Sequence, residues 1–370
     1  MTSNHLDGID PDVLSRVAAE RPRLMATKSA IGRTRQSLHQ SDTARQWYGE
    51  VEGQAKLLLD LPLLGPNWVH DPRETRAAPL PLVRPPKSSD GPAAPLDVAR
   101  LFCLRIQTLG LMWLITGDAR YCRRAKAQLL AVCAFPDWRG DKFLVTAETA
   151  FGAAIGYDWL YDSLTDNERR QIAQAIVEKA IQPGLDEFAA PRPPCWATAA
   201  VNWYLVCNGA LMIAALSVAE FDPRAARLFA LCCKSISTGF HEYGPDGGWA
   251  EGPGYWHYAT QYRSTFLTAY GQRSAPIWAS THRQDFQPRA SSDCTPRAHQ
   301  ESSSTSQMAR KIIAAVIGCF GWPNDTATRS TPALSCTGGK SIRWTSYGSR
   351  QTGAIRPTCQ QRAGFKRLVS

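Results

Sequence analysis

The sequence predicts an all-α protein in which helices follow one another as antiparallel hairpins. Between residues 96 and 270, apolar segments of helix length succeed one another with only short breaks. Those breaks carry residues that begin and end helices. The alternation, the Val/Ile/Thr runs and the Asn-Gly turns that are typical of strands are absent from this region.

Each expected helix is bounded by a cap or a helix breaker. Gly117 suits a helix C-terminus, and Asp118 directly after it can cap the next helix. Thr165 and Glu168 have the spacing of a capping box, and Asp222 precedes a proline at a first helical turn. The expected helices are 96–116, 118–135, 146–164, 168–181, 198–219, 224–240 and 253–270.

Helices of similar length joined by short turns pack as antiparallel hairpins. Several of these helices are apolar on more than one face, so they need neighbours on both sides. We therefore expect an (α/α) toroid or a solenoid, in which successive hairpins pack against one another. No strict repeat of the familiar helical types is present.

Composition divides the chain into three parts. Residues 1–95 contain helical pieces and, from residue 61, a proline-rich stretch that we expect to be an extended arm. Residues 96–270 form the expected helical domain. Residues 271–370 are an irregular basic tail, rich in Ser, Thr and Arg, and we favour the hypothesis that they come from a shifted reading frame of a GC-rich gene.

The chain has a formal net charge of +10. The whole excess lies in that tail, because residues 271–370 hold 14 basic and 4 acidic residues. A basic balance often indicates a nucleic-acid partner, but here it does not describe the helical domain. We therefore expect no nucleic-acid partner. No run of 18 uncharged apolar residues occurs, so we also expect no membrane span.

The start of the chain is polar and lacks the apolar core of a signal peptide. We expect a cytoplasmic protein as the sequence is written, and a periplasmic or secreted one if the start codon is misplaced. No C-x-x-C pair occurs, so we expect buried free thiols and neither a metal site nor a cofactor. The glycine-rich stretch 244–254 matches no phosphate-binding loop.

Two segments, 196–209 and 243–258, gather polar and aromatic residues against this apolar background. Asn202 and Asn208 fall in an expected apolar helix, where a buried amide needs partners. Each either bonds neighbouring helix ends or points into a cleft, and spacing alone leaves both open. Flat aromatic faces suit a sugar, although most of these rings could equally be core.

The runs NWYLVCNGALMIAAL and YGPDGGWAEGPGYWHYATQY resemble the helical domain of the heparinase II/III-like polysaccharide lyases, which are related to alginate lyases. The resemblance covers roughly residues 40–270. It implies an incomplete (α/α) toroid followed by an antiparallel β-sandwich. Residues 271–370 show no such sandwich pattern, so we expect that domain to be absent.

The resemblance also implies a chemistry, β-elimination at a uronic acid. A base removes the proton at C5, and a neutral donor stabilises the charge that develops on the carboxylate. By position in the motifs, Asn202 falls on the carboxylate-binding amide and Tyr255 on the catalytic tyrosine. A free tyrosine has a pKa of about 10, so a base role needs a positive neighbour.

Other motif residues are assigned by their neighbourhood. His257 and Tyr258 lie within a turn of Tyr255 and could support it, while Trp203 stands where some family members carry a histidine. We expect Glu251 to brace the loop. The candidate catalytic residues are Asn202, Tyr255, Tyr258 and His257, and the candidate substrate-binding residues are Trp203, Trp249, Trp256, Glu251 and Asn208.

Three functions remain open from the sequence. The first is a lyase acting on an anionic polysaccharide or oligosaccharide. The second is a glycoside hydrolase, which needs two carboxylates about 5–9.5 Å apart, for instance Asp246 with Glu251 or Asp158 with Asp162. The third is a non-catalytic remnant of a lyase. The sequence does not indicate which uronic-acid polymer is bound, or the oligomeric state.

Overall fold

A computed structural model describes residues 14, 20–67, 94–138, 143–192, 194–198, 201–243 and 247–271. All of them belong to one compact unit of the chain. Within these ranges every regular element is helical and no strand occurs, which confirms the all-α prediction. Most of the expected proline-rich arm, and the tail from residue 272 with its suspected frame shift, lie outside the described residues.

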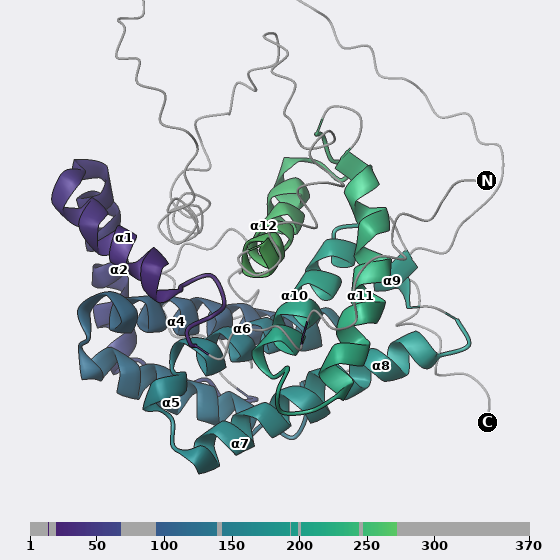
Figure 1. The fold of residues 1–370 in the computed structure, drawn as a ribbon, viewed down its shortest axis with the longest axis horizontal. Helices are drawn as coiled ribbons and strands as arrows, with labels where there is room; N and C mark the ends of the chain where they lie inside the picture. The colour runs from purple at the N-terminus through teal and green to yellow at the C-terminus, as the bar shows by residue number, and fades with distance from the viewer. Residues whose placement is uncertain are drawn as a thin grey trace, which may run out of the picture. The chain divides into compact units, whose positions relative to one another are not determined.

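The described helices run in the following order along the chain (Figure 1). They are α1 (Lys28–Gln40), α2 (Asp42–Asp60), α4 (Pro95–Thr116), α5 (Ala119–Cys133), α6 (Phe143–Trp159), η2 (Tyr161–Ser163), α7 (Asp166–Ile176), the π-helical turn η3 (Val177–Ile181), α8 (Gln182–Ala189), α9 (Cys195–Thr198), α10 (Trp203–Ser217), α11 (Arg224–Phe240), η4 (His241–Tyr243) and α12 (Pro253–Gly271).

The predicted caps are confirmed. Gly117 ends α4 in the left-handed conformation (φ 72°), and the Asp118 side chain accepts a hydrogen bond from the backbone of the first turn of α5. Thr165 and Glu168 form the full capping box of α7. Asp222 Oδ1 accepts from the Arg224 backbone N–H at 2.8 Å. Local sequence therefore determines where these helices begin and end.

The helix predicted over 198–219 is wrong in one respect that matters for the site. The structure divides it into α9, which ends at Thr198, and α10, which begins at Trp203. Asn202 is thus the residue before α10 and not an interior helix position. Its backbone N–H donates to Glu251 Oε2 at 2.5 Å, so a carboxylate replaces the carbonyl that would continue a helix.

The helix predicted over 168–181 also differs, because α7 continues through the π-helical turn into α8 and ends at Ala189. Pro183 lies in the first turn of α8. The wider turn before it lets the chain pass a residue that has no N–H to donate.

The helices lie in two rows (Figure 1). In one row α4 packs on α6, α6 on α10, and α10 on α12, so alternate helices of the chain are neighbours. The intervening helices α5, α7, α8 and α11 form a second row, in which α5 contacts α7 and α8 contacts α11. Helices that follow one another in the chain also pack together, as α4 does with α5 and α10 with α11.

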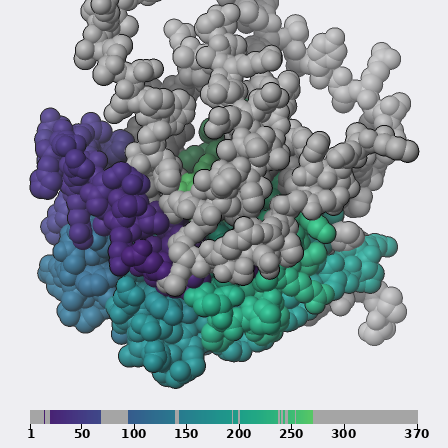
Figure 2. Space-filling model, in the orientation of Figure 1, coloured from purple at the N-terminus to yellow at the C-terminus, as the bar shows by residue number. Residues whose placement is uncertain are grey.

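The N-terminal helices extend this arrangement. Helix α2 packs against α4 and α5, and α1 packs against α2. In the space-filling view the purple surface of the N-terminal helices adjoins the blue surface of the helices that follow (Figure 2). The N-terminal part of the chain therefore belongs to the same hydrophobic core as the later hairpins.

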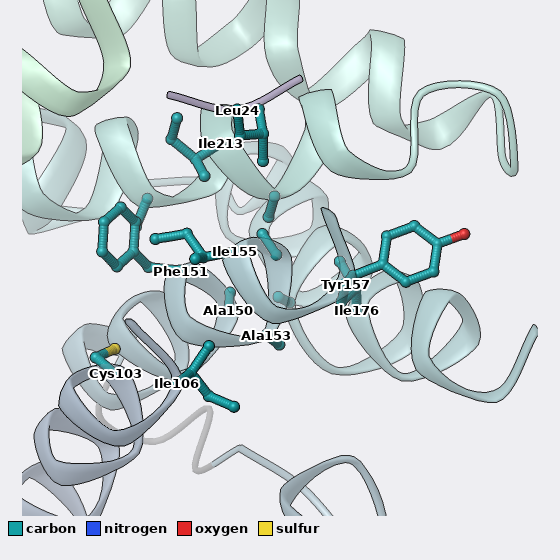
Figure 3. Packing of buried hydrophobic residues seen from close by; sticks show 14 of the residues in the cluster. Leu24, Cys103, Ile106, Ala150, Phe151, Ala153, Ile155, Tyr157, Ile176 and Ile213 are labelled. Carbon is teal, nitrogen blue, oxygen red and sulfur yellow. The ribbon is translucent and has the colours of Figure 1, made fainter. Parts of the chain in front are cut away.

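The core is centred on α6 and α10. Every residue of α6 is buried, from Phe143 to Trp159, and Figure 3 shows side chains of α6 packed between those of α4 and Ile213 of α10. Among the described helices, α4 alone has the length and apolar composition of a membrane span. Most of its side chains are buried in this core, and a core helix passes the same test.

The cysteines in these helices are part of the core. The expected free and buried thiols are confirmed for six residues: Cys103, Cys122, Cys133, Cys207, Cys232 and Cys233. Cys195, at the start of α9, is instead disulfide-bonded. Burial raises the pKa of the Cys133 thiol to about 12, so this group stays protonated and acts as a small apolar side chain.

Gly152 allows α4 and α6 to approach closely. A Cβ at this position would lie 2.8 Å from two ring carbons of Phe102 and 3.1 Å from Cys103 Sγ. We expect Gly152→Ala to lower the free energy of unfolding by about 1–3 kcal/mol, because the added methyl group would overpack the core. Urea denaturation followed by circular dichroism measures the change.

The matched control is Gly53→Ala in α2, where a Cβ meets no atom within 4 Å. There the substitution should raise stability by about 0.5–1 kcal/mol through helix propensity. If the two variants change stability equally, close approach is not the reason for the glycine in α6.

Candidate functional site

The two motif segments meet where α10 begins and the loop before α12 ends. Asn202 Nδ2 donates to Glu251 Oε1 at 3.0 Å and to Oε2 at 3.1 Å, in addition to the backbone hydrogen bond. The indole Nε1 of Trp249 donates to the same carboxylate at 2.9 Å. Three neutral N–H groups, contributed by Asn202 and Trp249, therefore converge on the Glu251 carboxylate.

Asn202 is almost wholly buried, with 3% of its surface exposed. Its Oδ1 atom has no hydrogen-bond partner among the described residues. A buried acceptor without a donor is costly and is an informative exception in a native structure. The Asn202 amide is thus held rigidly through its nitrogen, while its oxygen can still accept a hydrogen bond.

Asn208 serves the fold. It is fully buried inside α10, and its Nδ2 donates to the carbonyl of Tyr204 at 2.8 Å, one turn earlier. Trp196, which lies beside it, stacks on Phe143 with ring centroids 4.6 Å apart. The two asparagines differ in their place, because Asn202 lies at a helix start and Asn208 within the core. The Oδ1 atom of each is buried and has no hydrogen-bond partner among the described residues.

Tyr255 is half-exposed, with 50% of its surface accessible, in the first turn of α12. Trp256 and His257 are partly buried beside it, and Trp256 Nε1 donates to the Gly247 carbonyl at 2.8 Å. That hydrogen bond fastens the start of α12 to the loop that carries Glu251. Trp203 is also partly buried.

Tyr258 points into the core, unlike Tyr255. Its hydroxyl donates to Glu148 of α6, and the hydroxyl of Tyr262 donates to the other oxygen of that carboxylate at 3.0 Å. Arg100 of α4 donates to Glu148 at 3.0 Å and lies 5.2 Å from the centroid of the Tyr258 ring. We call Arg100, Glu148, Tyr258 and Tyr262 the Glu148 cluster.

Burial, together with the Glu148 charge, raises the pKa of the Tyr258 phenol well above its ordinary value. The group therefore remains protonated and donates to the carboxylate. Tyr258 joins α12 to α6 and α4, which is a positioning contribution to the helix that presents Tyr255.

The Glu148 cluster was not foreseen from the sequence. Its signal was present: Glu148 is the one acidic residue in the apolar run 143–157, and Arg100 is one of two basic residues in 96–116. Isolated charges in apolar helices need partners. The sequence does not reveal which helix supplies them.

One carboxylate pair considered for a hydrolase is not accessible. Asp158 is fully buried and bonded to Arg21 and to the backbone of Arg23 and Leu24, whereas Asp162 is exposed. Asp246, the possible partner of Glu251, lies outside the described residues. Within the described part of the chain, no group of three or more His, Cys, Asp or Glu residues could hold a metal ion.

Comparison with known proteins adds no assignment. No protein-family model matches this chain, and no curated protein is significantly similar to it in sequence. The lyase resemblance therefore rests on the sequence of the two motif segments.

Proposed function

We propose that this chain is a polysaccharide lyase that cleaves a uronic-acid-containing polysaccharide or oligosaccharide by β-elimination. The observation that supports this most is the joining of the two motif segments through Glu251. Glu251 ties the neutral amide of Asn202 to the loop before α12. The half-exposed phenol of Tyr255 lies in the first turn of that helix. We further propose that the two rows of helices belong to an incomplete (α/α) toroid.

In the reaction the C5–H electron pair becomes the C4=C5 double bond, and the C4–O bond breaks. The departing oxygen takes a proton. The carboxylate next to C5 gains negative charge in the transition state, and a neutral N–H donor stabilises that charge. Asn202 Nδ2 is such a neutral donor: it holds the Glu251 carboxylate in the structure, and it can donate to a substrate carboxylate that takes the place of Glu251.

Tyr255 is the proton-transfer residue in this proposal, as base, acid or both. Its exposure leaves the hydroxyl accessible to a sugar, whereas the buried Tyr258 hydroxyl is committed to Glu148. Trp249 and Trp256, which frame the loop, offer aromatic faces to the neighbouring sugar units.

The test is an assay of the full chain with alginate, heparan sulfate and glucuronan, followed by the ultraviolet absorbance of the unsaturated product. We expect Tyr255→Phe and Asn202→Ala each to lower kcat/KM by about 10²–10³-fold, because each removes a group acting on the transition state. Circular dichroism confirms that each variant is folded.

The matched control is Tyr48→Phe, which removes a partly buried hydroxyl from α2. This variant should keep the rate of the unchanged protein. If no polymer yields an absorbing product, or if Tyr255→Phe is as active as Tyr48→Phe, the proposal is wrong.

A further inference from the structure

The hydrogen-bond donors around Asn202 hold a carboxylate without any cation. The three contributing groups are the backbone N–H and the Nδ2 of Asn202 and the indole N–H of Trp249. We call these the Asn202 site. Among the described residues Glu251 makes no ion pair with them or with any other group, so neutral donors at the start of α10 carry the recognition. A helix N-terminus adds a favourable potential for an anion.

The carboxylate at this site comes from the loop before α12. Glu251 lies between Gly247 and Gly252, which have φ angles of 85° and 94°. Only glycine adopts such angles at little cost, so the two glycines allow the turns that bring Glu251 to Asn202. The Glu251 side chain is only partly buried, whereas Asn202 is almost completely buried. The two donors of Asn202 are thus more deeply buried than the carboxylate that they hold, whereas the Trp249 donor lies on the same loop as Glu251.

A second observation points to an external ligand. The Oδ1 of Asn202 is buried and accepts no hydrogen bond from the described residues. A glutamate carboxylate cannot supply that hydrogen bond, because it has no proton to donate. A uronic acid carries hydroxyl groups close to its carboxylate, so it offers both an acceptor for the N–H groups and a donor for Oδ1.

We propose that Glu251 is an internal occupant of the Asn202 site, and that the carboxylate of a uronate ligand takes its place when the Glu251 side chain moves out. The second half of this statement rests on the proposed function. Glu251 thereby holds the site in its donor geometry while it is empty of substrate, and it competes with weakly binding anions.

The experiment uses the full chain with Glu251→Ala. We expect the variant to have a lower Tm than the unchanged protein. Saturating sodium acetate should raise the Tm of the variant by about 2–4 °C, as expected for a ligand that stabilises the folded state by about 1 kcal/mol. Sodium chloride at equal concentration should not do so. The unchanged protein and the matched control Glu52→Ala, from α2, should show no acetate-specific shift.

If acetate and chloride have equal effects on Glu251→Ala, or if Asn202→Ala/Glu251→Ala responds to acetate as strongly as the single variant, the proposal is overturned. Should Glu251→Ala fail to fold, Glu251→Gln provides the measurement by calorimetric titration with glucuronate. Its amide is a poorer partner for three N–H donors, so glucuronate should bind about tenfold more tightly than to the unchanged protein. Equal affinities would overturn the proposal.

These outcomes are separate from those for catalysis. A protein that shows the acetate shift but produces no unsaturated sugar has the Asn202 site without the lyase activity. A protein that produces unsaturated sugar but shows no carboxylate-specific shift is a lyase in which Glu251 only braces the loop.

Discussion

Asp158→Ala is expected to lower the free energy of unfolding by about 3–5 kcal/mol, which is the usual cost of removing one partner of a buried ion pair. Asp158 is fully buried and lies 3.1 Å from Arg21, whose side chain is only 2% exposed. It also accepts from the backbone N–H groups of Arg23 at 2.9 Å and Leu24 at 2.7 Å. Alanine would leave the two backbone N–H groups without this acceptor, and Arg21 would keep its hydrogen bonds to Glu220 and to the Ser217 carbonyl.

The same contacts fasten the N-terminal segment to the helical core. Arg23 donates to the carbonyl of Leu216 at 2.7 Å, and Arg21 donates to that of Ser217 at 2.9 Å, both in the last turn of α10. Cations at a helix C-terminus are favourable. Loss of Asp158 therefore weakens the attachment of the segment before α1 as well as the ion pair.

Urea denaturation of Asp158→Ala and Asp42→Ala measures the difference. Asp42 pairs with Arg45 but is 97% exposed, so its removal should cost at most about 1 kcal/mol. If Asp158→Ala does not fold, Asp158→Asn keeps the shape and removes the charge. Similar midpoints for Asp42→Ala and either Asp158 variant would show that the buried pair is not what holds the segment.

Glu148→Ala is expected to have a comparable effect, about 3–5 kcal/mol, for the same electrostatic reason. It would remove the Glu148 carboxylate that pairs with the partly buried Arg100 guanidinium and accepts from the hydroxyls of Tyr258 and Tyr262. Because these residues come from α4, α6 and α12, the loss removes a polar contact between three helices of one row. The free energy of unfolding, measured in urea, reports it.

Glu52→Ala is the matched control, because Glu52 is a partly exposed glutamate of α2 that pairs with Lys56 at 3.0 Å. We expect a loss of about 0.5 kcal/mol or less there. If both variants unfolded at the same urea concentration, the Glu148 cluster would contribute no more to stability than the ion pair of Glu52, and the prediction would be wrong.

The parts of the fold set by local sequence could be predicted. Gly117, Asp118 and the Thr165 capping box act within one turn of their own helices, so spacing alone locates them. The start of α10 could not be predicted in this way. It depends on Glu251, a residue 49 positions later that takes the backbone N–H of Asn202.

The candidate site shows the same division. The sequence indicated the two motif segments, and the structure brings Asn202, Trp249 and Glu251 together. Tyr255 and Tyr258 are equivalent by spacing, and only packing distinguishes the half-exposed ring from the buried one. Which of the two hydroxyls stays accessible therefore depends on how α12 packs against α6.

The most direct test of elimination is the mass of the product released from a uronic-acid polymer by the full chain in ¹⁸O-labelled water. Elimination consumes no water, so the new non-reducing end should carry a C4=C5 double bond and the fragments should contain no ¹⁸O from cleavage. That result is what we predict. Saturated fragments with one ¹⁸O for each cleaved bond, at the new reducing end, would mean hydrolysis and would contradict the assignment of Asn202 and Tyr255.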